Sequence, residues 1–154
     1  MTAGEDLGED TGETLVIRRV LPVERERVFA AWLDPASLAT WMRPGESTDA
    51  IVEVDPRVGG RFRILMQQKQ GGGCGYEHQG EYLAIEPPSL LSFTWISAAT
   101  DLRPTVVTVE LHERDEGTEL VLTHRRLPRE RVDGHRQGWT DILRLLEREL
   151  AAGH

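Results

Sequence analysis

The strongest constraint on the fold lies near the end of the sequence, where apolar side chains recur at intervals of three or four residues. After Pro128 these positions form one continuous stripe, made of Val132, His135, Trp139, Ile142, Leu143, Leu146 and Leu150. Charged residues occupy the opposite face, at Arg136, Arg144, Glu147 and Arg148. This spacing predicts a long amphipathic helix. A stripe this wide needs a correspondingly large apolar surface to lie on.

The preceding segments predict a sheet that supplies this surface. Residues 14–21 are β-branched and aliphatic, which is typical of a strand. Two short helices are expected next, the first over residues 24–33 and the second over residues 35–41, with Pro35 in its first turn. Alternating apolar residues then predict six further strands, around residues 52–54, 62–64, 76–86, 91–95, 107–111 and 120–124. Most of the connections have the length of hairpin turns, which favours antiparallel pairing.

This order of elements predicts an α+β fold of the helix-grip type. A curved antiparallel sheet of about six to seven strands would wrap around the long C-terminal helix, with the two short helices following the first strand. A concave sheet and a straight helix differ in shape, so space is expected between them. A pocket in that space is the natural place to expect a ligand.

Composition sets the limits on domains and partners. The 154 residues fit one domain, expected over residues 14–154. Residues 1–13 carry five acidic and no basic residues, hence five of the eight net negative charges, and we expect an acidic, disordered leader.

The arginines are scattered among acids, which argues against nucleic-acid binding. We expect neither a secretory signal nor a membrane span from this sequence. Cys74 is the only cysteine, which excludes an internal disulfide and favours a cytoplasmic location.

Several motifs resemble a known family. They are Arg19, residues 26–35 (ERVFAAWLDP), Leu38 and Trp41, residues 53–63 (EVDPRVGGRFR), residues 80–82 (GEY), residues 85–88 (IEPP), residues 91–95 (LSFTW) and Gly138-Trp139. Together they resemble the bacterial homologues of the activator of the 90-kDa heat-shock chaperone ATPase, a branch of the START-like (SRPBCC) superfamily. The resemblance covers residues 14–150 and implies the same helix-grip fold. It also makes a homodimer an option, which the residues themselves do not address.

A hydrophobic cavity is what such domains share, so the expected function is binding of a hydrophobic or aromatic small molecule between the sheet and the last helix. The candidate ligand-binding residues are Trp41, Phe62, Tyr82, Trp95, His124, His135 and Trp139. Two alternatives stay open. One is a co-chaperone-like module that modulates an ATPase, and the other is a cyclase or hydrolase that uses a cavity histidine.

The two histidines are expected to point inward near the junction of the last strand and the last helix. They could be polar anchors or a general acid and base, or histidines satisfied by backbone and solvent at the cavity edge. Trp32 and Trp139 fall on helical apolar stripes, which favours a role in core packing for these two. A metal site would need a third ligand, for which His78 and Cys74 are the candidates. We expect no metal and no cofactor, and the glycine runs lack the features of a phosphate-binding loop.

Overall fold

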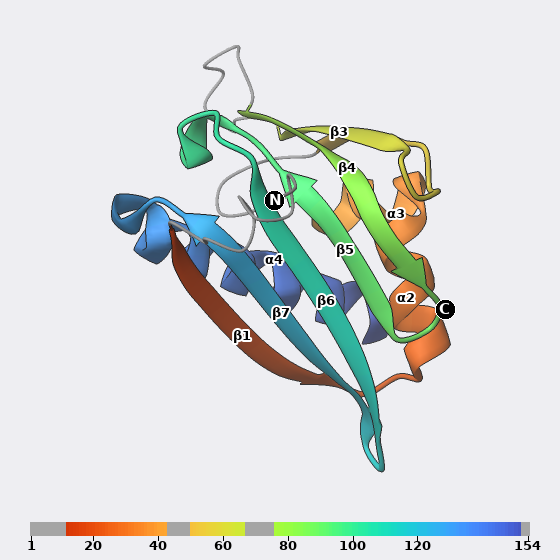
Figure 1. Ribbon diagram of the computed structural model, residues 1–154. Helices are drawn as coiled ribbons and strands as arrows, with labels where there is room; N and C mark the ends of the chain where they lie inside the picture. Colours follow the sequence, from red (N-terminus) through yellow and green to blue (C-terminus); the bar gives the residue numbers. More distant parts are fainter. Residues whose placement is uncertain (1–11, 43–49, 67–75, 152–154) are drawn as a thin grey trace, which may run out of the picture.

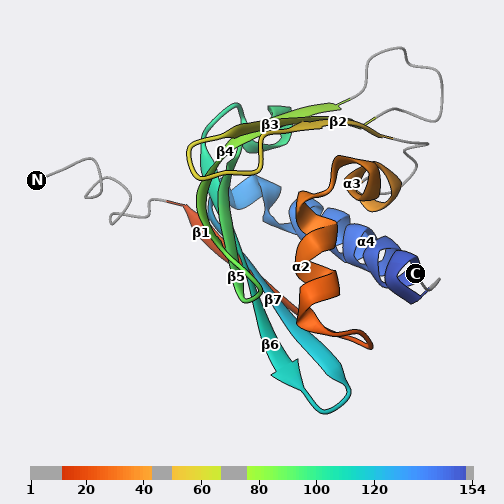
Figure 2. The ribbon, with the colours of Figure 1, turned by 90° about the vertical axis from the view of Figure 1, so that its right-hand side faces the viewer.

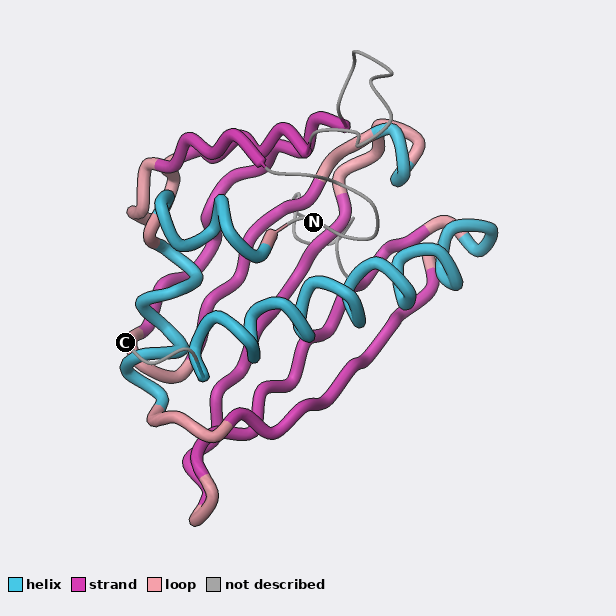
Figure 3. The backbone as a smooth tube through the Cα atoms, turned by 180° about the vertical axis from the view of Figure 1, so that it is seen from behind, coloured by secondary structure: helices cyan, strands magenta, loops and turns pink. Residues whose placement is uncertain are grey.

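The computed structural model describes residues 12–42, 50–66 and 76–151. Its seven strands form one antiparallel sheet in the order β1-β7-β6-β5-β4-β3-β2. Three helices lie on one face of this curved sheet, and α4 runs across the strands (Figures 1, 2 and 3). The elements are β1 (Glu13–Leu21), α2 (Arg25–Leu33), α3 (Pro35–Trp41), β2 (Ala50–Val54), β3 (Arg61–Met66), β4 (Tyr76–Glu86), β5 (Leu90–Trp95), η1 (Ala98–Thr100), β6 (Thr105–Arg114), β7 (Gly117–Leu127), η2 (Arg129–Arg131) and α4 (Val132–Ala151). The predicted α+β helix-grip class is confirmed.

The C-terminal helix follows the predicted stripe. Trp139, Ile142, Leu143, Leu146 and Leu150 are all buried, and the helix spans 20 residues. Two arginines from the first half of the chain hold its C-terminal part. Arg19 of β1 pairs with Glu147 at 2.7 Å, and Arg27 of α2 donates a hydrogen bond to the Leu150 carbonyl at 3.1 Å. These contacts fix the C-terminal part of α4 over the sheet.

Aromatic side chains fill the middle of the space between sheet and helices. The Trp32 ring lies 4.8 Å from Trp41 and 6.4 Å from Phe93, measured between ring centroids. Phe62 lies 5.4 Å from both Tyr82 and Phe93. All five side chains are 6% exposed or less. The expected space between sheet and helix is therefore closed at its centre, and a cavity is found toward the N-terminal end of α4.

A bulge in β4 decides which of its side chains face inward. Tyr82 pairs with Phe93 but Ala84 pairs with Ser92, so β4 contains one extra residue between these pairs. The extra residue exchanges the two faces of the strand. Before the bulge His78 and Tyr82 face the interior, the extra residue Leu83 is exposed, and after the bulge Ile85 packs against the core. The bulge, rather than the simple alternation of residues along the strand, thus decides which face His78 shares with Ile85.

Several expectations fall outside the described residues. The leader was expected over residues 1–13, of which 1–11 are not described, whereas Glu13 already belongs to β1 and pairs with Leu127. The glycine-rich loop at 71–75, with Cys74, is not described either, and the same holds for Pro44 and Gly45 after α3. None of the described helices has the length and apolar character needed to cross a bilayer.

Candidate functional site

A cavity of about 440 Å³ lies at the N-terminal end of α4. Its walls come from α4 and η2 on one side and from β4, the end of β5 and η1 on the other. The lining residues are His78, Trp95, Ser97, Ala98, Ala99, Glu130, Arg131, Gly134, His135, Gly138, Trp139 and Ile142. The hollow beside β2 and β3, by contrast, is bordered by charged side chains such as Glu53, Asp55 and Arg63. The cavity at α4 is therefore the best candidate for an apolar ligand.

Aromatic rings form one wall of the cavity. The ring centroids of Trp95 and Trp139 are 5.2 Å apart, and the His78 ring lies 4.7 Å from Trp95 with an interplanar angle of 36°. All three side chains are 8% exposed or less, so neighbouring residues hold them in place. The wall is therefore a preformed surface of mutually tilted aromatic rings, which suits an aromatic or alicyclic ligand.

Two glycines of α4 border the empty volume. Gly134, Gly138 and Ile142 follow each other at intervals of four, so they share one stripe of the helix. A Cβ atom built on Gly134 would meet no other atom within 4 Å. Glycine inside a helix is less stable than alanine by about 1 kcal/mol. Gly134 is exposed at the edge of the cavity, so packing does not require glycine there and a larger side chain would have room beside the cavity.

His124 lies behind the aromatic wall and fixes its geometry. Trp139 Nε1 donates a hydrogen bond to His124 Nδ1 at 3.0 Å. On the other side of the ring, Nε2 lies 2.7 Å from Thr105 Oγ1, and that hydroxyl donates to the Trp95 carbonyl at 2.6 Å. Because the single hydroxyl proton goes to the carbonyl, Nε2 must carry a proton and donate it to Thr105. His124 is thus the neutral Nε2–H tautomer, with both nitrogens engaged.

The environment of His124 favours this neutral form. The side chain is fully buried, and burial lowers its pKa well below 6.5, with the nearby His135 lowering it further. A general base needs an available nitrogen within reach of its substrate, and both nitrogens of His124 are taken up. The residue therefore connects Trp139 of α4 to Thr105 and Trp95 of the sheet.

His135 borders the cavity directly. Its Nδ1 lies 2.9 Å from the Arg131 carbonyl oxygen, so Nδ1 carries a proton and donates it to that oxygen. Its ring centroid lies 5.1 Å from that of His124, at right angles to it. Burial lowers the pKa of His135; the hydrogen bond to the Arg131 carbonyl opposes this, and the positive charge of Arg131 reinforces it. At neutral pH the ring is uncharged.

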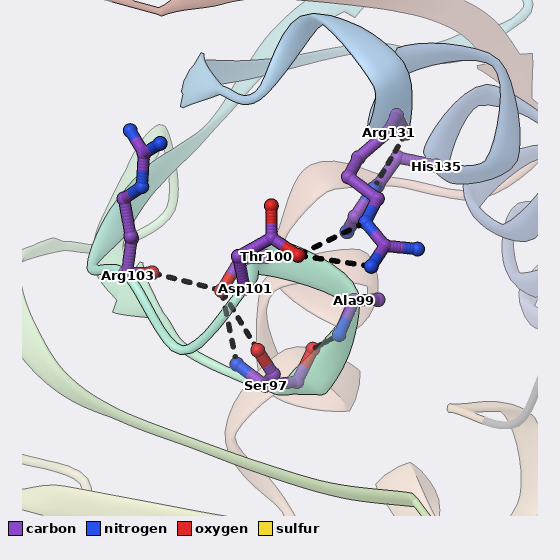
Figure 4. Close-up of polar contacts among 7 residues, drawn as sticks. All are labelled: Ser97, Ala99, Thr100, Asp101, Arg103, Arg131 and His135. Carbon is purple, nitrogen blue, oxygen red and sulfur yellow. Dashed lines mark hydrogen bonds and ion pairs between the residues drawn. The ribbon is translucent and has the colours of Figure 1, made fainter.

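The rim of the cavity joins η1 to the start of α4 (Figure 4). Ser97 caps η1, since its Oγ accepts from the Ala99 amide at 3.0 Å while its own amide donates to Thr100 Oγ1 at 3.1 Å. Arg131 then reaches across and pairs with Asp101 at 2.9 Å. Among the described residues, the charged side chains that line the cavity are Glu130 and Arg131, and Arg131 pairs with Asp101.

The structure brings three of the seven predicted site residues to the cavity, namely Trp95, His135 and Trp139. The other four do not line it. Trp41 is fully buried and donates from Nε1 to Ser37 Oγ at 3.1 Å, and His124 lies behind Trp139. Phe62 and Tyr82 belong to the packed centre, where burial, reinforced by the charge of Asp55, raises the pKa of Tyr82 to about 12.

Sequence reasoning did not place His78, Ser97, Arg131, Gly134, Gly138 and Ile142 at the site. Only the glycines left a usable signal: two of them, four residues apart, interrupt an otherwise good helix pattern beside its apolar stripe. As for a metal, the described residues bring together no group of three His, Cys, Asp or Glu side chains that could bind one. Cys74, one of the two candidate third ligands, is outside the described ranges.

Comparison with known proteins agrees with this fold. A crystal structure of a protein from Chromobacterium violaceum is 26% identical over 88% of this chain and 94% of that chain, with a TM-score of 0.78. The AHSA1 protein of Silicibacter pomeroyi is 29% identical over 92% of this chain and 100% of that chain, with a TM-score of 0.73. An AHSA1-like protein of Aeromonas hydrophila is 27% identical over 91% and 93% of the two chains, with a TM-score of 0.74. No protein with a curated description matches the sequence.

The match to a family model covers most of the domain. The model described as "Activator of Hsp90 ATPase homolog 1-like protein" matches residues 22–151, a range that contains every residue lining the cavity. This agrees with the resemblance seen in the sequence motifs. The chain therefore belongs to the family of Activator of Hsp90 ATPase homolog 1-like proteins.

Proposed function

We propose that this protein binds a small, largely apolar molecule with an aromatic or alicyclic ring in the cavity at the N-terminal end of α4. The observation that carries this proposal is the preformed wall of Trp95 and Trp139, which faces an empty volume bordered by Gly134. Ligand pockets typically have volumes of about 300–1,000 Å³ and mostly apolar walls with a few polar groups. The cavity of about 440 Å³ falls within this range.

The polar contacts behind the wall support the same function. A binding site gains affinity when its walls are already in place, because the protein then loses little entropy on binding. Here His124 joins Trp139 to the sheet at 3.0 Å, and Thr105 continues the contact to the Trp95 carbonyl. The single cysteine of the chain supports a cytoplasmic setting for this binding activity.

The test compares the protein with a variant whose cavity is filled. A Gly134→Leu side chain would project into the open space, where its Cβ meets no atom within 4 Å. A hydrophobic library is screened by native mass spectrometry and calorimetry against both proteins. We expect compounds that bind the wild type and lose at least tenfold in affinity for Gly134→Leu, while thermal unfolding stays within a few degrees.

The control variant is Ile51→Leu, which changes an apolar side chain at a half-exposed position of β2. Gly80→Ala cannot serve as the control, because Gly80 packs in the core. Ile51→Leu should bind like the wild type. The proposal is overturned if no library member binds the wild type, or if the compounds that bind do so equally well to Gly134→Leu.

A further inference from the structure

The cavity contains one side chain whose hydrogen-bonding role is fixed by the protein itself. His135 donates from Nδ1 to the Arg131 carbonyl, one turn earlier along the chain. In a neutral imidazole with the proton on Nδ1, the other ring nitrogen is an acceptor only. Nε2 lies at the tip of the ring, away from the helix backbone, and no contact within the described ranges engages it. His135 therefore offers the cavity an acceptor and no donor.

The opposite wall offers a donor. Ser97 borders the cavity from the η1 side and is 3% exposed. Its Oγ accepts a hydrogen bond from the Ala99 amide, which leaves the hydroxyl proton without an acceptor among the described residues. A buried hydroxyl proton gains free energy when it finds an acceptor. The two walls thus present complementary polar groups, an acceptor on α4 and a donor beside η1.

The charges at the rim do not favour an anionic ligand. Arg131 is the only cation that lines the cavity within the described residues, and its Nη2 already pairs with Asp101 at 2.9 Å. Glu130 also lines the cavity and would repel an anion. The Nε2 lone pair of His135 adds partial negative charge at the same end. A neutral ligand fits this arrangement better than a carboxylate or a phosphate.

From these contacts we propose that the ligand is a neutral aromatic alcohol whose hydroxyl donates a hydrogen bond to His135 Nε2. This inference rests on the proposed function and specifies the chemistry of its ligand. A hydroxyl suits the site better than an N–H group because it can donate a hydrogen bond to His135 and also accept one from the Ser97 hydroxyl. Stacking against Trp95 and Trp139 supplies the apolar part of the affinity.

The experiment uses two probes that differ only in this donor. 2-Naphthol carries the hydroxyl, and 2-methoxynaphthalene has the same ring system but cannot donate. Calorimetry measures both on the wild type and on His135→Phe, which keeps a ring beside His124 and removes both nitrogens. We expect 2-naphthol to bind the wild type about tenfold more tightly than the ether, as one neutral hydrogen bond to an otherwise unpaired group would give. In His135→Phe the two affinities should be equal, with that of the ether unchanged.

The outcomes separate this inference from the proposed function. If both probes bind the wild type equally, and both are lost in Gly134→Leu, the function stands and the hydroxyl assignment is wrong. If the preference for 2-naphthol persists in His135→Phe, His135 is not the acceptor. If neither probe binds the wild type, the cavity does not take aromatic ligands and both proposals fall. A long-range ¹H–¹⁵N spectrum of the wild-type histidines checks the Nδ1–H tautomer independently of any ligand.

Discussion

The two ends of α4 lie on the same sheet and meet it in different ways. Toward the C-terminus, Leu143, Leu146 and Leu150 are fully or almost fully buried, and the rings of Trp32, Trp41 and Phe93 fill the adjoining space. Toward the N-terminus, the exposed Gly134 and the partly buried Gly138 border open space, and a cavity remains. The helix is continuous through both regions, so the hollow arises from the residues on its face rather than from a break in the fold.

The surroundings of Gly80 and Gly134 illustrate the difference between the packed region and the cavity. At Gly80 of β4 an added Cβ would lie 2.6 Å from Cζ of Phe62, because the Phe62 ring covers the glycine of the paired strand. At Gly134 an added Cβ would meet nothing within 4 Å. The absent side chain is replaced by an aromatic ring in the first case, whereas the second glycine is exposed at the edge of the cavity and faces open space. The comparison teaches that close packing requires glycine at position 80, while position 134 leaves room for a larger side chain.

The largest loss of stability is expected from a substitution in the packed region, where Trp32, Trp41 and Phe93 lie. Trp41→Ala removes a fully buried indole that contacts Trp32 and donates to Ser37. Loss of such a ring should lower the free energy of unfolding by about 3–5 kcal/mol, because a cavity replaces it. Urea denaturation measures this. A loss below 1 kcal/mol would show that this region is not tightly packed.

Gly80→Ala should come next. The added methyl collides with the Phe62 ring and with the backbone of β5, so the packed end must shift to accept it. Overpacking of this kind lowers the free energy of unfolding by about 1–3 kcal/mol. The measurement is again urea denaturation, with Ile51→Ala on a half-exposed position of β2 as control. Full stability in Gly80→Ala would contradict the close packing of Phe62.

Acid should lower the free energy of unfolding through His124, which lies behind the cavity wall. Burial lowers the pKa of His124 well below the unfolded value of 6.5, so the unfolded chain takes up its proton first as the pH falls. Stability from this group is complete above pH 6.5 and declines below it, by up to about 1.4 kcal/mol per pH unit. Denaturation of the wild type and of His124→Gln between pH 7.5 and pH 5 measures it.

The groups around His124 are His135 of α4, whose pKa is also lowered, the cation of Arg131 beside His135, and the uncharged Thr105 and Trp139. His135 remains in the variant, so the slope for His124→Gln should be smaller and not zero. Equal slopes for the two proteins would contradict a neutral, buried His124.

Gly134→Ala should have the smallest effect and the opposite sign. The methyl group enters open space, and alanine is a better helix former, so the free energy of unfolding should rise by up to about 1 kcal/mol. Thermal unfolding measures the change. A destabilised variant would mean that the position next to the cavity is already occupied.

The positions of the helices and strands could be predicted well from the sequence. The stripe of α4 and the strand from Tyr76 to Glu86 are found where the periodicity placed them, and His124 faces inward as its strand parity indicated. Such patterns succeed because burial of one face is a local property of a helix or strand. The family resemblance is likewise confirmed by the match over residues 22–151.

The position of the cavity could not be predicted in the same way. Periodicity shows that Trp41 and Phe62 face inward, but how far they fill the interior depends on residues distant in the sequence, such as Trp32 and Phe93. The orientation of His78 depends on a bulge after Tyr82 that the amino-acid pattern does not predict. That Gly134 borders the cavity can be recognised only once the positions of the surrounding elements are known.

The four tryptophans allow the most direct test, because two lie in each region. The indole N–H signals in a ¹H–¹⁵N spectrum are assigned by single Trp→Phe variants and followed during titration with 2-naphthol. We predict that the signals of Trp95 and Trp139 shift and saturate together, while those of Trp32 and Trp41 stay in place, because these two lie in the packed region and do not line the cavity. Shifts at Trp32 and Trp41, with Trp95 and Trp139 unchanged, would contradict a binding site at the N-terminal end of α4.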